Sequence, residues 1–197
     1  MNDLQRFIDI SKSEFDRFVN NIDRDGLRQA ADLILDATKQ GNRLHITGIG
    51  KPAHIAGYAA SLISSTGTPT YFLHGTEAVH GSCGQLAAGD VVICISNSGE
   101  TEELKATAMA IKNNGCRIIA VTGNPESWLG KYGEVCLVAG VQQEGGPLNR
   151  APRASILAET YLLQCLSVLL QEAVDITPAE YVKRHPGGSL GKLRDGE

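Results

Sequence analysis

Five short apolar runs, separated by segments of helical spacing, most constrain what this chain can fold into. The runs are continuously apolar rather than alternating, which is typical of strands buried on both faces of a parallel sheet. They lie at Leu44–Thr47, Thr70–Leu73, Val91–Ile95, Arg117–Val121 and Val135–Val138, and helical segments lie between them at Pro52–Ser65, Thr101–Asn114 and Ser127–Lys131. This alternation predicts an α/β fold, a three-layer αβα sandwich around a five-stranded parallel sheet of order 2-1-3-4-5.

Further helical segments precede and follow this alternation. Residues 3–22 carry an apolar stripe with three of the four phenylalanines; such a stripe either packs into the core or forms a subunit contact, and the pattern favours neither. Residues 23–41 predict a second helix that ends at a glycine. Residues 154–174 predict a helix that is apolar on almost every side. Because a small sheet covers only one side of such a helix, we expect it to lie in a subunit interface.

The chain length predicts one domain over residues 1–197, since 197 residues suffice for one core and are few for two. We expect N-terminal helices at 3–41, an α/β core at 42–174 and a tail at 175–197. The tail carries four cations around His185. It suits either a solvated basic tail or a functional segment.

Composition argues against several classes of protein. The net charge of −4 argues against a protein that grips nucleic acid. We read no stretch as long enough to span a membrane, so we expect no membrane partner. The five cysteines are scattered without a C-x-x-C pair, which favours reduced thiols in the cytoplasm over a zinc site or a disulfide framework. We therefore expect a cytoplasmic protein.

A polar turn after the third strand is the first candidate for binding. The hydroxyls of Ser96, Ser98 and Thr101 surround Gly99, where the strand passes into a helix. Gly99 allows a tight turn, and the free N–H groups of the helix, its dipole and the hydroxyl donors together favour an anion, most naturally a phosphate. The alternative is a Ser/Asn-rich turn that only caps the helix.

A second turn follows the first strand, at Gly48, Gly50 and Lys51. In the predicted order, strands 1 and 3 are neighbours at the switch point where open parallel sheets bind ligands, so both turns should face one pocket. The Lys51 ammonium could neutralise a phosphate or polarise an oxygen there. As a motif Gly-x-Gly-Lys is weak, because it lacks the spacing of a P-loop and a surface lysine at a helix start is the commoner explanation.

Acids and histidines in the loops could carry chemistry. Glu144 lies in an irregular stretch between the last strand and the long helix, where the sequence gives it no capping role, so we interpret it as catalytic. Glu103 follows Glu100 by three residues and is expected on the same helix face; alternatively, these acids only favour the helix dipole. His80 and His185 stand beside glycine or proline rather than on an apolar face.

Two carboxylates, a lysine and histidines around a phosphate site suit the removal of a proton next to a carbonyl group. One carboxylate removes the proton, an acid or an ammonium stabilises the enediolate, and a histidine moves a proton to and from the ring oxygen. This chemistry is an aldose–ketose isomerisation, for which we expect neither a metal nor an organic cofactor.

Five stretches of the chain resemble the sugar isomerase (SIS) domain family, in particular its D-arabinose 5-phosphate isomerase group of the capsule and lipopolysaccharide Kdo pathway. In order they read GIGKPAHIA, STGTPTYFLHGTEAVHG, DVVICISNSGETEEL, EGGPLNRAP and HPGGSLGKL. The resemblance runs from about residue 44 to residue 193. Many members of the group also contain a pair of cystathionine-synthase-like regulatory modules, and the resemblance does not include these modules.

The resemblance also implies roles for individual residues. It implies that Glu144 is the base of the enolisation and that His185 acts across the interface of a homo-oligomer, a dimer or a tetramer, with shared active sites. The implied catalytic residues are Lys51, His80, Glu103, Glu144 and His185, and the implied phosphate-binding residues are Gly48, Gly50, Ser96, Ser98, Gly99 and Thr101.

The resemblance therefore implies a sugar-phosphate isomerase that interconverts D-ribulose 5-phosphate and D-arabinose 5-phosphate. Two alternatives stay open: another SIS isomerase of this length, such as 6-phospho-3-hexuloisomerase, and a non-catalytic sugar-phosphate sensor. The sequence shows no helix-turn-helix segment that would support the sensor. Asn149, Arg150 and Arg153 depart from the neutral or hydroxyl-bearing pattern of the isomerase group, and the two cations could change which sugar phosphate is accepted.

Overall fold

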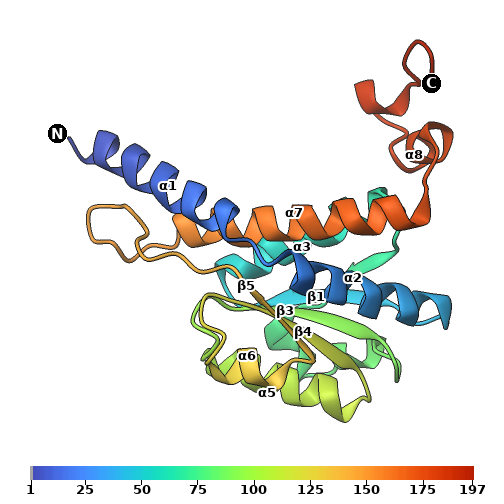
Figure 1. Ribbon diagram of the computed structural model, residues 1–197. Helices are drawn as coiled ribbons and strands as arrows, with labels where there is room; N and C mark the ends of the chain where they lie inside the picture. Colours follow the sequence, from blue (N-terminus) through green and yellow to red (C-terminus); the bar gives the residue numbers. More distant parts are fainter. Residues whose placement is uncertain (1) are drawn as a thin grey trace.

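The computed structural model describes residues 2–197 and is organised around a five-stranded parallel sheet (Figure 1). The strands are β1 (Leu44–Gly48), β2 (Thr70–Phe72), β3 (Val91–Ile95), β4 (Arg117–Thr122) and β5 (Val135–Val138). Their order is β2-β1-β3-β4-β5, and every neighbouring pair is parallel. The predicted fold class and strand order are confirmed.

Helices cover both faces of the sheet (Figure 1). One layer contains α1 (Asp3–Asn20), α2 (Arg24–Lys39), α3 (Lys51–Ser65) and α7 (Ala154–Val174), and the other contains α4 (Gly75–Ala78), α5 (Glu102–Asn113) and α6 (Trp128–Tyr132). Two short elements of the α/β core, α4 and the 3-10 turn η1 (Ser82–Gln85), were not predicted from the sequence, and neither were the two short elements of the tail described below.

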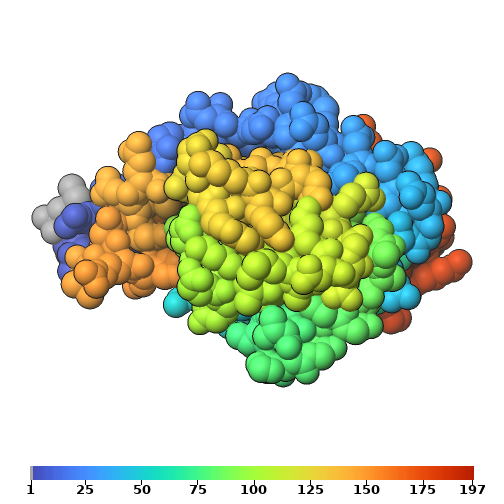
Figure 2. All heavy atoms as spheres, turned by 90° about the horizontal axis from the view of Figure 1, so that it is seen from below, coloured from blue at the N-terminus to red at the C-terminus, as the bar shows by residue number. Residues whose placement is uncertain are grey.

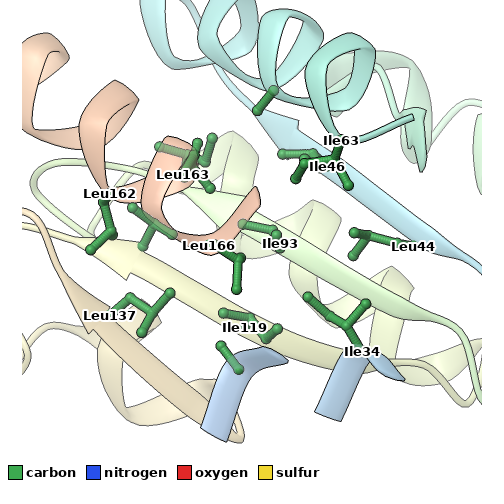
Figure 3. Close-up of a cluster of buried hydrophobic side chains, with 14 of the residues drawn as sticks. Ile34, Leu44, Ile46, Ile63, Ile93, Ile119, Leu137, Leu162, Leu163 and Leu166 are labelled. Atoms are coloured by element: carbon green, nitrogen blue, oxygen red, sulfur yellow. The ribbon is translucent and has the colours of Figure 1, made fainter. Parts of the chain in front are cut away.

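The core has two halves because successive strand residues face opposite layers. Ile93 and Ile119 pack towards α7, with Leu166 of that helix above them (Figure 3). Val92 and Cys94 pack towards α5 on the other side. β1 and β3 are buried along their whole length, and each fully buried aliphatic side chain contributes roughly 1.5–3 kcal/mol. Burial on both faces is the reason why these strands are continuously apolar.

α7 lies along the sheet and packs against α1, α2 and α3 (Figure 1). It has 21 residues and is, by length and composition alone, apolar enough to cross a membrane, so the statement that no stretch reaches that length is wrong. Half of its apolar window is buried inside the structure, as in a core helix of a globular domain. Leu157 and Val168 stay 47% and 61% exposed, and a subunit interface along this helix stays a prediction.

The apolar stripe of α1, for which the sequence allowed either core packing or a subunit contact, is buried at one end and exposed at the other. Phe18, near the end of the helix, is buried in the core beside α7. Leu4 and Ile8, near its start, are 65% and 47% exposed, on the part of the helix that projects beyond the sheet (Figure 1). The stripe is therefore core at one end, and its other end is uncovered.

The C-terminal tail contains a short helix, α8 (Pro178–Arg184), and a 3-10 turn, η2 (Ser189–Gly191). α8 begins at a capping box, in which the Thr177 hydroxyl accepts from the Glu180 N–H and the Glu180 carboxylate accepts from the Thr177 N–H. Neither element contains a buried residue. The tail thus has local structure but adds little to the core.

A buried polar cluster joins the amino ends of β1 and β3. The Asp90 carboxylate accepts hydrogen bonds from the Arg43 N–H at 2.8 Å, the Ala87 N–H at 2.9 Å and His45 Nε2 at 3.1 Å. The His45 and Asp90 side chains are each 1% exposed. Burial lowers the pKa of His45 despite the nearby carboxylate, so a neutral ring that donates its Nε2–H fits this geometry.

Candidate active site

The polar turn between β3 and α5 is closed by its own hydroxyls. The Ser96 side chain is buried, and its Oγ accepts from the Gly99 N–H at 3.1 Å and lies 3.1 Å from the Thr101 hydroxyl. The exposed Ser98 Oγ accepts from the Glu100 N–H at 3.2 Å. A hydroxyl that accepts a hydrogen bond keeps its own proton, so Ser98 can still donate to a ligand.

The start of α5 is left without a side-chain cap. Thr101 is the N-cap residue, but its side chain makes no hydrogen bond to the helix backbone. The first N–H groups of α5 and the positive end of its dipole therefore remain available to an anion. This geometry favours the phosphate-binding interpretation of the turn over the capping interpretation.

Gly99 is required by both its backbone angle and its surroundings. Its φ is +67°, a backbone conformation that residues other than glycine rarely adopt. A Cβ at this position would lie 2.0 Å from Ser127 Oγ and 2.9 Å from Thr122 Oγ1. The turn therefore packs directly onto the loop before α6, which holds its backbone in place.

Glu100 ties the turn to α6 rather than lying on α5. Its carboxylate pairs with the Lys105 ammonium at 2.8 Å and accepts from the Trp128 N–H at 2.7 Å. The Lys105 ammonium, and then the Trp128 N–H, lower the pKa of Glu100. The expectation that Glu100 and Glu103 share a helix face is wrong, because α5 begins at Glu102 and Glu100 precedes it.

The turn after β1 lies beside the turn between β3 and α5. Gly48 pairs in register with Ile95, so the two turns leave the sheet at the same level. Lys51 is the first residue of α3, is exposed, and has no ion pair within residues 2–197. A cation at the first turn of a helix opposes the helix dipole, so helix stability gives no reason for a lysine here.

Glu144 has a structural role that the sequence analysis missed. Its Oε2 accepts from the Arg153 N–H at 2.6 Å and from the Ser155 N–H at 3.2 Å, at the first turn of α7. The expectation that Glu144 caps no helix is wrong, because the capped turn is about ten residues further along the chain. Within residues 2–197 Oε1 makes no hydrogen bond, so one carboxylate oxygen remains for a ligand.

A cavity of about 650 Å³ connects Lys51 with the loop that carries Glu144. Its lining consists of Lys51, Pro147, Leu148, Arg150, Ala151, Pro152 and Arg153. The Asn149 side chain holds the loop in shape by accepting from the Glu144 and Gly145 N–H groups. The structure thus brings Lys51 and the Glu144 loop together, whereas Ser98 and Glu144 do not themselves line this cavity.

Glu103 and His80 lie outside the lining of this cavity. Glu103 is exposed in the first turn of α5, and His80 is exposed between α4 and η1. Neither makes an ion pair in the part of the chain that the structure describes. Glu103, beside the turn that follows β3, therefore remains available to a ligand bound there.

His185 lies at the opposite end of the molecule from Glu144. Glu144 contacts the start of α7, whereas His185 follows its end, and a helix of 21 residues is roughly 30 Å long. Figures 1 and 2 both place the orange loop and the red tail at opposite ends. His185 stacks on Tyr181, with ring centroids 4.3 Å apart, and its Nδ1 is buried without a partner within residues 2–197. Within one chain, therefore, His185 and Glu144 do not meet.

Glu159, in α7, was not identified from the sequence as a functional candidate. Its side chain is fully buried, and neither of its oxygens has a hydrogen-bond partner within residues 2–197. A signal was present in the sequence, because Glu159 is an acid in a helix that is otherwise apolar on almost every side. In residues 2–197 no three His, Cys, Asp or Glu side chains form a cluster that would hold a metal ion.

Several proteins with an assigned name are similar in sequence to this chain. The arabinose 5-phosphate isomerase KdsD of Pseudomonas aeruginosa is 39% identical over 188 residues, which are 95% of this chain and 56% of that protein. The protein of the same name in Francisella tularensis is 37% identical over 90% of this chain and 54% of its own length. The chain thus spans about half the length of these relatives.

A solved structure extends the comparison over a whole chain. The Escherichia coli CFT073 protein c3406, solved in complex with arabinose 5-phosphate, has a TM-score of 0.81 and 34% identity, covering 94% of this chain and all of that one. Residues 38–168 match the model of the SIS domain family. On this match, and on a parallel sheet with polar turns at its carboxyl edge, the chain belongs to the SIS domain family.

Proposed function

We propose that this chain is a sugar-phosphate isomerase that interconverts D-arabinose 5-phosphate and D-ribulose 5-phosphate. The main support is the 34% identical protein that was solved with arabinose 5-phosphate and matches over its full length. The longer relatives named arabinose 5-phosphate isomerase support the same activity. The Vibrio vulnificus NanR protein complexed with ManNAc-6P, and a Methanococcus jannaschii protein with an inferred function of 3-hexulose-6-phosphate isomerase, match at 20% identity, a level that concerns the fold alone.

The phosphate of the sugar binds at the turn between β3 and α5. The hydroxyls of Ser96, Ser98 and Thr101 and the uncapped N–H groups of α5 are the donors. Gly48 and Gly50 let the neighbouring turn approach closely without side chains, and Lys51 adds a positive charge beside it. Charge-assisted hydrogen bonds of this kind fix one end of the substrate.

Glu144 is the base of the reaction. In the aldose-to-ketose direction, its carboxylate takes the proton from C2 of the open-chain sugar, and the electron pair moves through the C1–C2 bond to the carbonyl oxygen. The proton returns to C1, while a proton moves from the C2 oxygen to the C1 oxygen. Oε2 is held by two N–H groups and Oε1 is unbonded, so Oε1 is the atom placed to carry the proton.

The remaining site residues support charge and proton movement. Lys51 polarises the carbonyl oxygen and stabilises the enediolate, since it lines the same cavity as the Glu144 loop. Glu103 and His80 assist proton movement at the oxygens. Arg150 and Arg153 line that cavity as well, so they act on which sugar phosphate is accepted.

A panel of pentose and hexose 5- and 6-phosphates, assayed for isomerisation in metal-free buffer, tests this function. The proposal expects turnover of D-arabinose 5-phosphate and D-ribulose 5-phosphate well above that of any hexose phosphate. Binding of D-arabinose 5-phosphate without turnover would support a sensor instead. A preference for hexulose 6-phosphates would support the hexuloisomerase alternative.

Ser98→Ala should weaken binding of the phosphate end of the substrate. The loss of one charge-assisted hydrogen bond is worth roughly 1.5–3 kcal/mol, which is about tenfold or more in KM. Steady-state kinetics measure the change, with kcat expected to stay close to that of the unmodified protein. Ser13→Ala, at an exposed position of α1, is the matched control; an equal KM in both variants would contradict a phosphate contact at Ser98.

The homo-oligomer is part of the proposal, because one chain does not bring His185 to Glu144. We expect the partner's tail to supply His185, which opens the sugar ring. Glu144→Gln and His185→Ala should each be nearly inactive. Each mixed dimer has one of its two sites intact, and about half of the dimers in an equal, co-refolded mixture are mixed, so the mixture should regain about a quarter of full activity. Mixtures that stay as inactive as the two parents would contradict shared sites.

We further propose that the enzyme works in the cytoplasm. All five cysteines are free thiols, as a reducing compartment maintains them. Burial raises the pKa of all five thiols above the ordinary value of 9.0. These thiols are therefore mostly protonated and react slowly as nucleophiles.

A further inference from the structure

Two carboxyl groups meet the first turns of α7 in opposite environments. Glu144 approaches from the loop, and its Oε2 accepts from the Ser155 N–H at 3.2 Å. Glu159 follows Ser155 by one helical turn and therefore lies on the same face of the helix. The Glu159 side chain is 0% exposed, and both of its oxygens, like Ser155 Oγ, are buried without a hydrogen-bond partner within residues 2–197.

The buried environment of Glu159 favours its protonated form. An ionised carboxylate that is buried without a partner is costly, so such a group keeps its proton. Burial, with the negative charge of Glu144 as the second cause, raises the pKa of Glu159 to about 8. Glu144 instead accepts hydrogen bonds from two N–H groups at the start of α7.

Other ionisable groups near α7 have no comparable effect on Glu159. Glu14 and Arg17 of α1 pair with each other, and Tyr58 of α3 accepts from Gln164. The remaining ionisable side chains of α1, α2 and α3 are exposed. The local charge that acts on Glu159 is therefore that of Glu144.

We propose that Glu159 is a positioning residue for Glu144: a buried carboxylic acid beneath the base that must stay neutral during turnover, because its own negative charge would act on the base. The proposal rests on the proposed role of Glu144 as the base. Two acids placed in environments that separate their proton affinities take different roles, and here one remains protonated while the other reacts.

When Glu159 loses its proton at alkaline pH, a second negative charge appears beside Glu144 and beside the enediolate that forms in the transition state. Like charges in a poorly solvated site repel, so the barrier rises and kcat falls. The fall should be reversible, because it follows a titration and not unfolding.

The pH dependence of kcat on D-arabinose 5-phosphate tests the role. The unmodified enzyme should lose activity with an apparent pKa near 8. Glu159→Gln, which is neutral at every pH, should keep kcat at pH 7 within a few-fold and lack this alkaline fall, whereas Glu159→Asp should keep the fall. Glu172→Gln, the same change at an exposed position of α7, is the control and should match the unmodified enzyme.

A readout that does not depend on activity decides the state of Glu159. The infrared band of a protonated carboxylic acid should be present at pH 7 in the unmodified protein, disappear as the pH passes 8, and be absent from Glu159→Gln. The folded-state pKa is raised above the ordinary value of 4.5, so the folded chain binds the extra proton between these values. The melting temperature should therefore fall as the pH rises from about 5 to about 8, and less so in Glu159→Gln.

The outcomes separate this inference from the proposed function. Superimposable pH profiles of Glu159→Gln and the unmodified enzyme would overturn the positioning role and leave the isomerase intact. An unmodified protein that isomerises no sugar phosphate would overturn both. If Glu159→Gln does not fold, loss of the infrared band in the unmodified protein on raising the pH supports the inference, and a band that is absent at pH 7 overturns it.

Discussion

Glu144→Gln should lower kcat for D-arabinose 5-phosphate at least ~10²-fold and leave KM nearly unchanged, because a general base contributes about 10²–10⁴-fold. The amide oxygen of glutamine can still accept from the Arg153 and Ser155 N–H groups, so the start of α7 should keep its structure. Steady-state kinetics give both constants. Exchange of the C2 hydrogen with heavy water, followed by NMR, should be lost in parallel.

A second acid that holds the same loop provides the control for this variant. Glu14 Oε2 accepts from the Gln142 N–H at 3.0 Å, so Glu14→Gln perturbs the anchoring of the loop without touching the base. We expect a small effect of Glu14→Gln on kcat. A Glu144→Gln enzyme with full kcat, or with a raised KM alone, would show that Glu144 binds the substrate but does not take its proton.

Asp90→Ala should destabilise the fold by at least about 3 kcal/mol, because each buried donor left without its acceptor costs roughly 1–3 kcal/mol. The substitution leaves the Arg43 N–H, the Ala87 N–H and His45 Nε2 without their acceptor at the amino ends of two central strands. Urea unfolding at neutral pH measures the free energy of unfolding. Since that free energy is typically 5–15 kcal/mol for a whole domain, the variant should be close to unfolding at growth temperature.

Asp32→Ala is the matched control for the Asp90 variant. Asp32 is exposed on α2, and its substitution should change the free energy of unfolding by no more than about 0.5 kcal/mol. Asp90→Asn should lie between the two, because its amide retains one acceptor oxygen. Equal stability of Asp90→Ala and Asp32→Ala would mean that water replaces the lost acceptor and that the cluster contributes little.

Much of the fold follows from local pattern. The continuous apolar runs at 91–95 and 117–121 can be buried only between two layers, so their presence predicts a parallel sheet and, with it, the edge at which the loops gather. The turn between β3 and α5 is local in part. Ser96, Gly99 and Thr101 lie within six residues and bond to one another, while the loop before α6 holds the turn from outside.

The sequence by itself therefore determined the sheet and the turn that ends β3, because the apolar runs and the residues that bond within the turn are local in the chain. The strand order followed from the topology typical of such an alternation of strands and helices, although the paired strand residues, such as Leu44 and Val91, are distant in sequence. The tertiary structure alone decided that Glu144 caps α7, that Glu100 bonds to Trp128, 28 residues away, and that Glu159 turns inward. Each depends on which distant segments pack together and on the rotation of α7 against the sheet. The length of α7 likewise separates His185 from Glu144 in one chain, which no motif spacing could show.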